Sequence, residues 1–345
     1  MKLLILKPSS LGDILHTFPA AAMLRQALPD AELSWVANDS LAQIVQLFPG
    51  LHRILPFPRK EIGRCNLKAV HAFIRLLREE TYDAILDFQG LLRTGLVCLF
   101  ARRAPCYGFA HAREGAPFFY SRRIAVPPEL RHAVDKNCFL ARAFLHDLGL
   151  EAPAGVPEAA LQLPEAWRQS AQRLLDERLP GDGPLLAVGC SSRWESKSWS
   201  PEFFADTLAE VRRLRPDARI WLLGSPDERE RAETVRTLAG LPPESDFAGA
   251  TDLGALTALL AHSRLLFTND SGPMHIAAAL GTSCVACFGA TDPTLTGPYG
   301  PPGRHAVLRS PCPQSPCRRR TCPLHPPCCT TVPPATAAAT IAERL

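Results

Sequence analysis

Short apolar runs alternate with amphipathic stretches along the first half of the chain. Apolar runs of strand length occupy residues 3–6, 33–37 and 82–88, and apolar positions at helical spacing mark residues 14–28 and 66–80. The first pattern favours buried strands and the second favours helices. Strands that alternate with helices are typical of βαβ units with parallel strands. The first half therefore predicts a parallel α/β domain over residues 1–160.

The second half repeats this alternation after an interruption. Proline and glycine gather at residues 152–157 and 180–184, so we expect a linker over residues 161–184, whose amphipathic stretch at 165–178 could pack on either domain. Strands are then predicted at 185–189, 219–223, 265–268 and 284–288, and helices at 201–215, 226–239, 253–262 and 273–280. These elements predict a second α/β domain over residues 185–330, followed by a C-terminal helix within 331–345.

The whole pattern predicts an α/β protein of two doubly wound domains that face a central cleft. In such sheets, ligands bind beyond the carboxyl ends of the strands, close to the N-termini of helices. The turns that follow strands are therefore the places where chemistry is expected.

Composition excludes several classes of protein. Hydrophobic residues make up 46% and charged residues 21% of the chain, as in soluble globular proteins. The net charge is only +4, so a nucleic-acid partner is not expected. No apolar run reaches the roughly 20 residues that span a bilayer, and the N-terminal residues lack the pattern of a secretory signal. We expect a cytoplasmic enzyme.

The 12 cysteines fall into two groups. Those that stand singly in apolar contexts are expected to be buried thiols: Cys65, Cys98, Cys106, Cys138, Cys190, Cys284 and Cys287. The others crowd the C-terminal tail near His325: Cys312, Cys317, Cys322, Cys328 and Cys329. Because this tail holds no C-x-x-C pair, a zinc site there is an option that we do not favour, and reduced thiols in an irregular tail are the preferred interpretation.

The turn after the strand at 265–268 has the features of an anion site. Backbone N–H groups at Ser271 and Gly272 and the dipole of the following helix favour a phosphate. Asp270 would repel a phosphate, and it is better suited to sugar hydroxyls. His275, one turn into the helix, could donate to a phosphate oxygen. The alternative is that Asp270 or Ser271 merely caps the helix.

A second polar turn follows the first strand of the second half. The hydroxyls of Ser191 and Ser192 and the ammonium of Lys197 could hold a diphosphate, and Ser200 is expected to cap the next helix. A single lysine is more often a solvated surface charge. Trp199 is expected in the core.

Two carboxylates lie at similar places. Asp13, just past the first strand, is suited to a general base, although it could instead cap the helix that begins at Ile14. Glu228, after the strand at 219–223, could accept the hydroxyls of a ribose, or could simply complement a helix dipole.

Basic residues gather in the first half, in or beside its loops. They are Arg59, Lys60, Arg64, Lys68, Arg93, Arg102, Arg103, Arg113, Arg122 and Arg123. Charge runs are usually solvated faces, yet their place favours an anionic acceptor. The basic helix at 66–80 could also rest on an anionic membrane surface.

Together these stretches resemble the heptosyltransferases of lipopolysaccharide core synthesis, glycosyltransferase family 9. The resemblance spans about residues 1–300. Its motifs are LILKPSSLGDILHTFP at 4–19, YDAILDFQGL at 82–91, NDSGPMH at 269–275, FGATDP at 288–293 and TGPYG at 296–300. The first half is more similar to the members that add the first heptose than to those that add the second.

This resemblance implies a GT-B fold, with two Rossmann-like domains that bind the acceptor and the nucleotide sugar respectively. It implies metal-independent transfer from ADP-heptose with inversion, at the inner face of the cytoplasmic membrane, to a glycolipid of the Kdo–lipid A type. Asp13 matches the general base. The donor site is matched by Ser191, Ser192, Lys197, Glu228, Thr251, Asp270, Ser271, Gly272 and His275. The candidates for acceptor binding are Lys7, Arg59, Arg93, Arg113 and His132.

Other functions stay open at this point. The nearest alternative is another GT-B glycosyltransferase with a different nucleotide sugar, followed by a non-catalytic nucleotide-sugar-binding homologue or an assembly protein with a zinc-held tail. A nicotinamide dehydrogenase would need G-x-G-x-x-G after the first strand, and the sequence lacks it.

Overall fold

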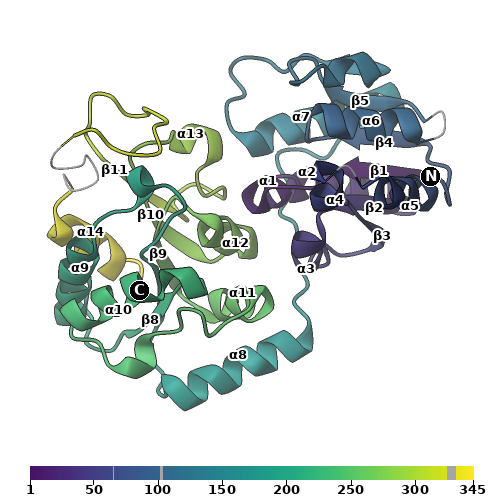
Figure 1. The fold of residues 1–345 in the computed structure, drawn as a ribbon. Coiled ribbons are helices and arrows are strands. Elements are labelled where there is room, and N and C mark those ends of the chain that lie inside the picture. The colour runs from purple at the N-terminus through teal and green to yellow at the C-terminus, as the bar shows by residue number, and fades with distance from the viewer. Residues whose placement is uncertain (65, 102–103, 325–331) are drawn as a thin grey trace. The chain divides into compact units, whose positions relative to one another are not determined.

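A computed structural model describes residues 1–64, 66–101, 104–324 and 332–345. It divides the chain into two compact units, Met1–Gln162 and Leu163–Leu345 (Figure 1). Several residues named above lie outside the described residues: Cys65, Arg102, Arg103, His325, Cys328 and Cys329. Among the described residues, no helix is long and apolar enough to cross a membrane.

The first unit is built on a six-stranded parallel sheet in the order β3-β2-β1-β4-β5-β6. Its strands are β1 (Lys2–Leu6), β2 (Glu32–Ala37), β3 (Leu51–Pro56), β4 (Ala84–Asp87), β5 (Cys106–Phe109) and β6 (Arg122–Ile124). Its helices are α1 (Leu11–Leu15), α2 (Phe18–Ala27), α3 (Ala42–Val45), α4 (Arg59–Gly63), α5 (Leu67–Leu77), α6 (Leu92–Phe100) and α7 (Ala133–Asp147). This strand order is that of the doubly wound dinucleotide-binding fold.

The second unit carries a five-stranded parallel sheet in the order β11-β10-β9-β7-β8. Its strands are β7 (Leu185–Gly189), β8 (Arg219–Leu223), β9 (Leu265–Asn269), β10 (Ser283–Phe288) and β11 (Ala306–Arg309). Its helices are α8 (Glu165–Arg178), α9 (Pro201–Leu214), α10 (Arg229–Leu238), α11 (Leu253–His262), α12 (Gly272–Leu280), α13 (Pro293–Thr296) and α14 (Pro334–Ala342). Helices cover both faces of this sheet (Figure 1). The predicted architecture of two Rossmann-like parallel sheets is confirmed.

Both sheets lie between layers of helices, so the central strands are buried on both sides. All five residues of β7 and of β9 are buried, as are four of the five in β1. Strands covered on both faces read as continuous apolar runs, which is why the sequence pattern located them. The predicted helix at 14–28 is wrong in one respect, because the chain forms α1 and α2 there. Pro19 lacks the N–H that a continuous helix needs, and it sits instead in the first turn of α2.

The segment expected as a linker, residues 161–184, contains α8, which packs on α11 of the second unit. Gly254 permits this contact, since a Cβ there would lie 2.7 Å from the ring of Trp167. The C-terminal helix α14 packs on α9 and adds Ala337, Ala338 and Ile341 to the core. Both helices therefore belong to the second unit.

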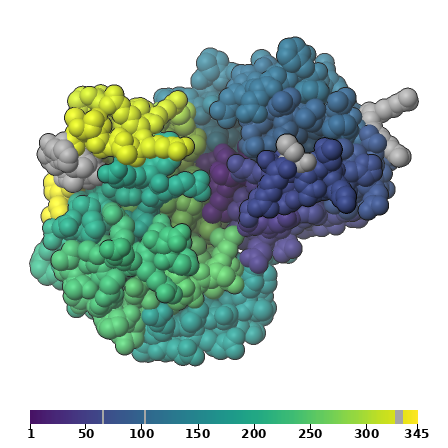
Figure 2. Space-filling view, viewed as in Figure 1, coloured from purple at the N-terminus to yellow at the C-terminus, as the bar shows by residue number. Residues whose placement is uncertain are grey.

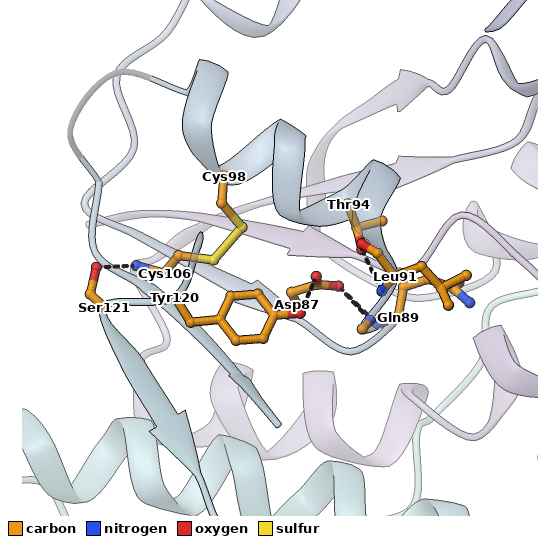
Figure 3. The surroundings of a disulfide bond; sticks show 9 residues. Asp87, Gln89, Leu91, Thr94, Cys98, Cys106, Tyr120 and Ser121 are labelled. Carbon is orange, nitrogen blue, oxygen red and sulfur yellow. Dashed lines mark hydrogen bonds between the residues drawn. A yellow bond between two sulfur atoms is a disulfide. The ribbon is translucent and has the colours of Figure 1, made fainter. Parts of the chain in front are cut away.

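One prediction about the cysteines is wrong. Cys98 and Cys106 form a disulfide bond and are not free thiols (Figure 3). Cys98 lies in α6 and Cys106 opens β5, with their Cα atoms 6.1 Å apart, and an apolar context along the sequence does not reveal that these two elements approach each other. The predicted buried thiols are confirmed at Cys138, Cys190, Cys284 and Cys287.

Candidate functional site

Each sheet has one point at which the strand order reverses, between β1 and β4 in the first unit and between β7 and β9 in the second. At such a point the loops after the two strands diverge and leave room for a ligand. In the second unit these loops are residues 190–199 and the turn at 270–272. Six of the nine predicted donor residues therefore lie in the two loops that the topology favours: Ser191, Ser192, Lys197, Asp270, Ser271 and Gly272.

A buried ion pair joins the two loops of the second unit. Lys197 Nζ lies 2.7 Å from Asp270 Oδ2, and the two side chains are 18% and 6% exposed. The hydroxyl of Thr291 donates to the same carboxylate oxygen at 2.5 Å. The ammonium of Lys197 also lies 4.7 Å from the centre of the Trp194 ring. Lys197 is thus held in place, and the interpretation of it as a solvated surface charge is wrong.

The N-terminus of α12 begins directly after this carboxylate. Its N-cap residue, Ser271, makes no side-chain cap hydrogen bond, and the Ser271 hydroxyl lies 3.2 Å from that of Thr268. The interpretation of Asp270 or Ser271 as a simple cap is therefore wrong. The backbone N–H groups of Gly272 and Met274, on either side of Pro273, open α12 two residues after the carboxylate that Lys197 contacts, and such groups at a helix N-terminus suit an anion.

The loop at 190–199 is braced against the same turn. The hydroxyl of Ser192 donates to the carbonyl oxygen of Asp270 at 2.9 Å, and the backbone N–H of Trp199 donates to Oδ1 of Asn269 at 3.2 Å. Trp199 itself is fully buried, as predicted, and Ser200 caps α9 through a bond from the backbone N–H of Phe203 at 3.2 Å. The loop and the turn therefore form one connected site.

A pocket of about 420 Å³ opens beside this loop. It is lined by Ser191, Ser192, Glu195, Ser198, Ser200, Pro201, Asp227, Glu228, Arg231 and Cys322. Glu228 accepts a bond from the backbone N–H of Ser225 at 2.7 Å, which fixes its carboxylate at the pocket wall. Both predicted serines and the predicted ribose ligand thus line one cavity.

Two further predicted donor residues lie in the same unit. Thr251 is half-buried in the loop before α11. This loop is tied to the end of β8 two residues earlier, where the backbone N–H of Gly249 donates to the carbonyl oxygen of Gly224 at 2.8 Å. His275 is half-buried in the first turns of α12. These positions leave the predicted roles of both residues untested.

In the first unit, Asp13 lies in α1, directly after β1. Its Oδ2 accepts bonds from the backbone N–H of Ser10 at 2.9 Å and from the Ser10 hydroxyl at 2.7 Å. Ser10 is the N-cap residue of α1 and Asp13 is its third residue, so Asp13 is not itself the N-cap, but its carboxylate does cap the helix start by completing a capping box with Ser10. The carboxylate is oriented by the helix start, which leaves its role as a base a prediction.

A buried network lies behind Asp13. Lys7 is 7% exposed, and its ammonium donates to the carbonyl oxygen of Phe88 at 2.8 Å. Burial lowers the pKa of Lys7, the carboxylates of Asp13 and Asp87 oppose that shift, and Arg113 adds to it. The ammonium of Lys7 therefore has the carbonyl oxygen of Phe88 as its partner inside the protein. The predicted role of Lys7 in binding the acceptor stays untested.

Asp87 anchors this network from β4 (Figure 3). It is fully buried, and it accepts bonds from the backbone N–H groups of Gln89 at 2.9 Å and Gly90 at 3.1 Å and from the hydroxyl of Tyr120 at 2.7 Å. Burial raises the pKa of Asp87, and these hydrogen bonds oppose the shift. The loop after β4 is thereby fixed close to Lys7.

The other predicted acceptor residues are partly clustered. Burial lowers the pKa of Arg93, the charge of Arg59 adds to that shift and Glu114 opposes it, so the charges of these three side chains lie close enough to interact. Arg113 is exposed, and its backbone N–H donates to the carbonyl oxygen of Gly90 at 3.0 Å. His132 caps α7 by accepting the N–H of Val134 at Nδ1, at 3.2 Å. Their acceptor role stays a prediction.

Sequence reasoning missed three contributors to the donor site. Thr291, which holds Asp270, lies in the FGATDP motif but received no role. Arg231 binds the carbonyl oxygen of Cys190 at 2.8 Å and that of Trp199, and so ties the ends of the loop together. The sequence could have indicated Arg231, because it lies three residues after Glu228 and residues at this spacing share one face of a helix. Cys322, in the tail, lines the pocket.

The tail cysteines Cys312, Cys317 and Cys322 are half-buried and outside any disulfide bond. Among the described residues, the one group that could hold a metal ion is Glu32, His52 and Glu80 in the first unit, and Lys2 pairs with both of its carboxylates. Since three members of the tail cluster lie outside the described residues, the zinc option there stays untested.

Comparison with known proteins identifies the family. Residues 70–327 match glycosyltransferase family 9 (heptosyltransferase). The chain is 31% identical to lipopolysaccharide heptosyltransferase 1 of Pseudomonas aeruginosa over 337 residues, which cover 94% of this chain and 88% of that protein.

Solved structures agree with this match. The structure of the Escherichia coli heptosyltransferase WaaC with ADP is 27% identical, covers all of both chains and has a TM-score of 0.78. A family 9 glycosyltransferase of Veillonella parvula, 22% identical, covers 100% of this chain and 97% of its own with a TM-score of 0.82, and supports the fold. The chain belongs to glycosyltransferase family 9, the heptosyltransferases.

Proposed function

We propose that this glycosyltransferase moves a heptose from ADP-heptose to an anionic acceptor of the lipopolysaccharide inner core, of the Kdo–lipid A type, with inversion and without a metal ion. The observation that carries the proposal is the Lys197–Asp270–Thr291 cluster beside the uncapped start of α12. Relatives support the choice of donor, because the Escherichia coli enzyme was solved with ADP and with ADP-2-deoxy-2-fluoro heptose.

The donor half of the reaction uses charge that the chain itself supplies. The diphosphate would sit on the first amides of α12 and against the ammonium of Lys197, and Glu228 would accept the ribose hydroxyls. As the bond from the anomeric carbon to the phosphate oxygen breaks, negative charge grows on ADP. Preformed donors at that place stabilise the leaving group, in the role that a divalent ion would otherwise have.

The acceptor half uses Asp13 as the base. An acceptor hydroxyl attacks the anomeric carbon from the face opposite to ADP, and its proton passes to the Asp13 carboxylate as the new C–O bond forms. A single displacement of this kind inverts the anomeric configuration. The cations Arg59, Arg93 and Arg113 would bind carboxylates and phosphates of the acceptor.

The test is Asp13→Asn in a turnover assay with ADP-heptose and a truncated Kdo–lipid A acceptor, read as ADP release and product mass. Loss of a positioned base should lower kcat by about 10²- to 10⁴-fold and leave ADP affinity unchanged. Asp30→Asn, at an exposed aspartate after α2, is the control and should keep full activity. Turnover by Asp13→Asn at the level of the Asp30→Asn control would remove Asp13 from the mechanism.

We further infer that the first unit binds peripherally to the inner face of the cytoplasmic membrane. Leu67, at the start of α5, is 78% exposed beside Lys68, and Ile62 in α4 is 37% exposed beside Lys60. Apolar side chains with flanking cations suit an anionic bilayer surface. Leu67→Glu should reduce flotation with vesicles that contain phosphatidylglycerol, whereas Leu238→Glu, at a 55% exposed leucine of α10, should not. Equal flotation of both variants would contradict this inference.

A further inference from the structure

We propose that residues 310–324, here called the tail segment, form a wall of the donor pocket and hold Lys197 in position. This inference rests on the proposed function, since it assigns a role at the same nucleotide-sugar site. In Figure 2 the yellow spheres of the tail lie directly against teal-green spheres of earlier chain in the same unit. From the sequence this segment is rich in proline, arginine and cysteine, and it received no role at the donor site.

The tail segment is anchored first along the end of β10. The backbone N–H of Ser310 donates to the carbonyl oxygen of Phe288 at 3.0 Å. The hydroxyl of Ser315 donates to the carbonyl oxygen of Gly289 at 2.6 Å, and the backbone N–H of Arg318 donates to the carbonyl oxygen of Ala290 at 2.8 Å. The next residue, Thr291, holds the Asp270 carboxylate. The tail segment thus follows the backbone that supports the ion pair.

Arg318 shows that these contacts constrain the chain. Its φ is 55°, a left-handed conformation that residues other than glycine adopt at a cost in free energy. The contacts on either side of Arg318 hold it in this conformation, so the tail segment follows a defined path over the site.

The tail segment then grips the loop that carries Lys197. Ser196, which precedes Lys197, is 4% exposed. Its backbone N–H donates to the carbonyl oxygen of Arg320 at 3.1 Å, and its hydroxyl donates to that of Arg319 at 2.5 Å. The short helical turn Glu195–Lys197 is therefore fixed to the tail segment through Ser196 and to Asp270 through Lys197.

A cation pair around Trp194 strengthens this grip. The guanidinium carbon of Arg320 lies 5.8 Å from the centre of the Trp194 ring, and the ammonium of Lys197 lies 4.7 Å from it. Aromatic rings attract cations at such distances. Arg320 and Lys197 therefore share one ring, and Ser196, Trp194 and Arg320 act as positioning residues for Lys197.

The tail segment also reaches the cavity itself. Cys322 lines the pocket together with Ser191, Ser192 and Glu228, whereas Cys312 and Cys317 are not among its lining residues. A nucleotide bound in this pocket would cover the thiol of Cys322. The segment therefore supplies both a support for the phosphate-binding lysine and part of the surface that the nucleotide contacts.

The first test separates positioning from general structural damage. Ser196→Ala removes one hydrogen bond to the tail segment, and Arg320→Ala removes the cation over Trp194. Each should raise the donor KM by about 2- to 10-fold, the effect of one ordinary interaction, and leave the acceptor KM unchanged. Arg320→Lys should restore the donor KM. Ser245→Ala, at a buried serine of the same unit, is the control. An equal rise of donor and acceptor KM in the Ser196 and Arg320 variants would overturn the positioning role.

The second test uses Cys322 as a probe. The chain is alkylated with N-ethylmaleimide, with and without saturating ADP, and the adducts are located by peptide mapping. ADP should slow modification of Cys322 at least about tenfold and leave Cys312 and Cys317 unaffected. ADP affinity of the unmodified chain is measured in parallel by calorimetry. ADP that binds without protecting Cys322 would overturn the role of the tail segment alone, whereas a chain that does not bind ADP would overturn the proposed function as well.

Discussion

The ion pair between Lys197 and Asp270 can be removed from either side, and the two removals should not be additive. Lys197→Met takes away the ammonium and keeps most of the side-chain volume. Asp270→Asn takes away the negative charge and keeps the shape. The double variant has neither charge. The structure predicts that each single change harms both the stability of the second unit and its affinity for ADP.

The expected size follows from the geometry. At a separation of 2.7 Å, and with an effective dielectric constant of about 20, the two charges attract by roughly 6 kcal/mol. The loss of hydration of both groups offsets much of this. Removing one partner leaves the other charge nearly buried, so each single variant should lose about 3–5 kcal/mol of unfolding free energy. The double variant should fall short of the sum by about 1–3 kcal/mol.

Urea unfolding followed by tryptophan fluorescence suits this measurement. Of the five tryptophans, only Trp35 lies in the first unit, so the signal reports mainly on the second. ADP affinity is measured separately by calorimetry in native buffer. Lys197→Met should weaken ADP binding even where the variant is fully folded, because the ammonium is also a proposed phosphate ligand.

Two results would refute this reasoning. Additive losses in the double variant would mean that the ion pair contributes no coupling to stability. Unchanged ADP affinity in folded Lys197→Met would mean that the ammonium does not meet the diphosphate.

Three other predictions follow from packing and burial. Gly189→Ala places a Cβ 2.6 Å from the hydroxyl of Thr268 and should lower the free energy of unfolding by about 1–3 kcal/mol, measured by thermal unfolding. Gly63→Ala is the control, because a Cβ there would meet nothing within 4 Å and should leave the free energy of unfolding unchanged. Equal effects of the two substitutions would contradict the packing argument. Asp87→Ala leaves two backbone N–H groups and the buried hydroxyl of Tyr120 without their acceptor, and it should lower the free energy of unfolding in urea by about 3 kcal/mol or more. A decrease of less than about 1 kcal/mol would be inconsistent with this hydrogen-bond network. Burial lowers the pKa of His305 from 6.5 to about 4. Because the unfolded chain therefore binds a proton at a higher pH than the folded chain, the free energy of unfolding should fall by at most about 3 kcal/mol as the pH decreases from 6.5 toward 4. His305→Leu should flatten the stability profile over that interval, and an unchanged slope would contradict the assignment.

The sequence located the central strands because parallel strands covered on both faces are uninterrupted apolar runs. It did not locate β3, β5, β6 or β11. In β3, His52 and Arg53 interrupt the apolar run, and β11 is only half-buried, so neither has a clear pattern. In β6 none of the three residues is buried, and β5 is a run of only four residues that includes Gly108. A place at the edge of a sheet is not by itself the reason, because the edge strand β8, with four of its five residues buried, was located.

The candidate site divides in the same way. The turn at Asp270 and the loop at Lys197 were each recognisable, because in both places a strand is followed by a polar turn and then by the first residues of a helix. Their ion pair joins residues 73 positions apart, and no local pattern contains it. The burial of Lys7 and the proposed role of the tail segment likewise depend on which distant segments of the chain lie side by side in the tertiary structure.

The second sheet ends in an unusual edge, and this edge has a consequence for solubility. Beyond β8, a further strand is reduced to a single bridge between Leu222 and Asp246, with the N–H of Phe247 donating to the carbonyl oxygen of Leu222 at 3.0 Å. Arg178, the last residue of α8, donates to the carbonyl oxygen of Asp246 at 2.7 Å and lies over the Phe247 ring. An uncovered strand edge is a template for pairing with other chains. Because Arg178 at the end of α8 covers part of this edge, we expect its removal to favour precipitation of the protein without changing any of the proposed site residues.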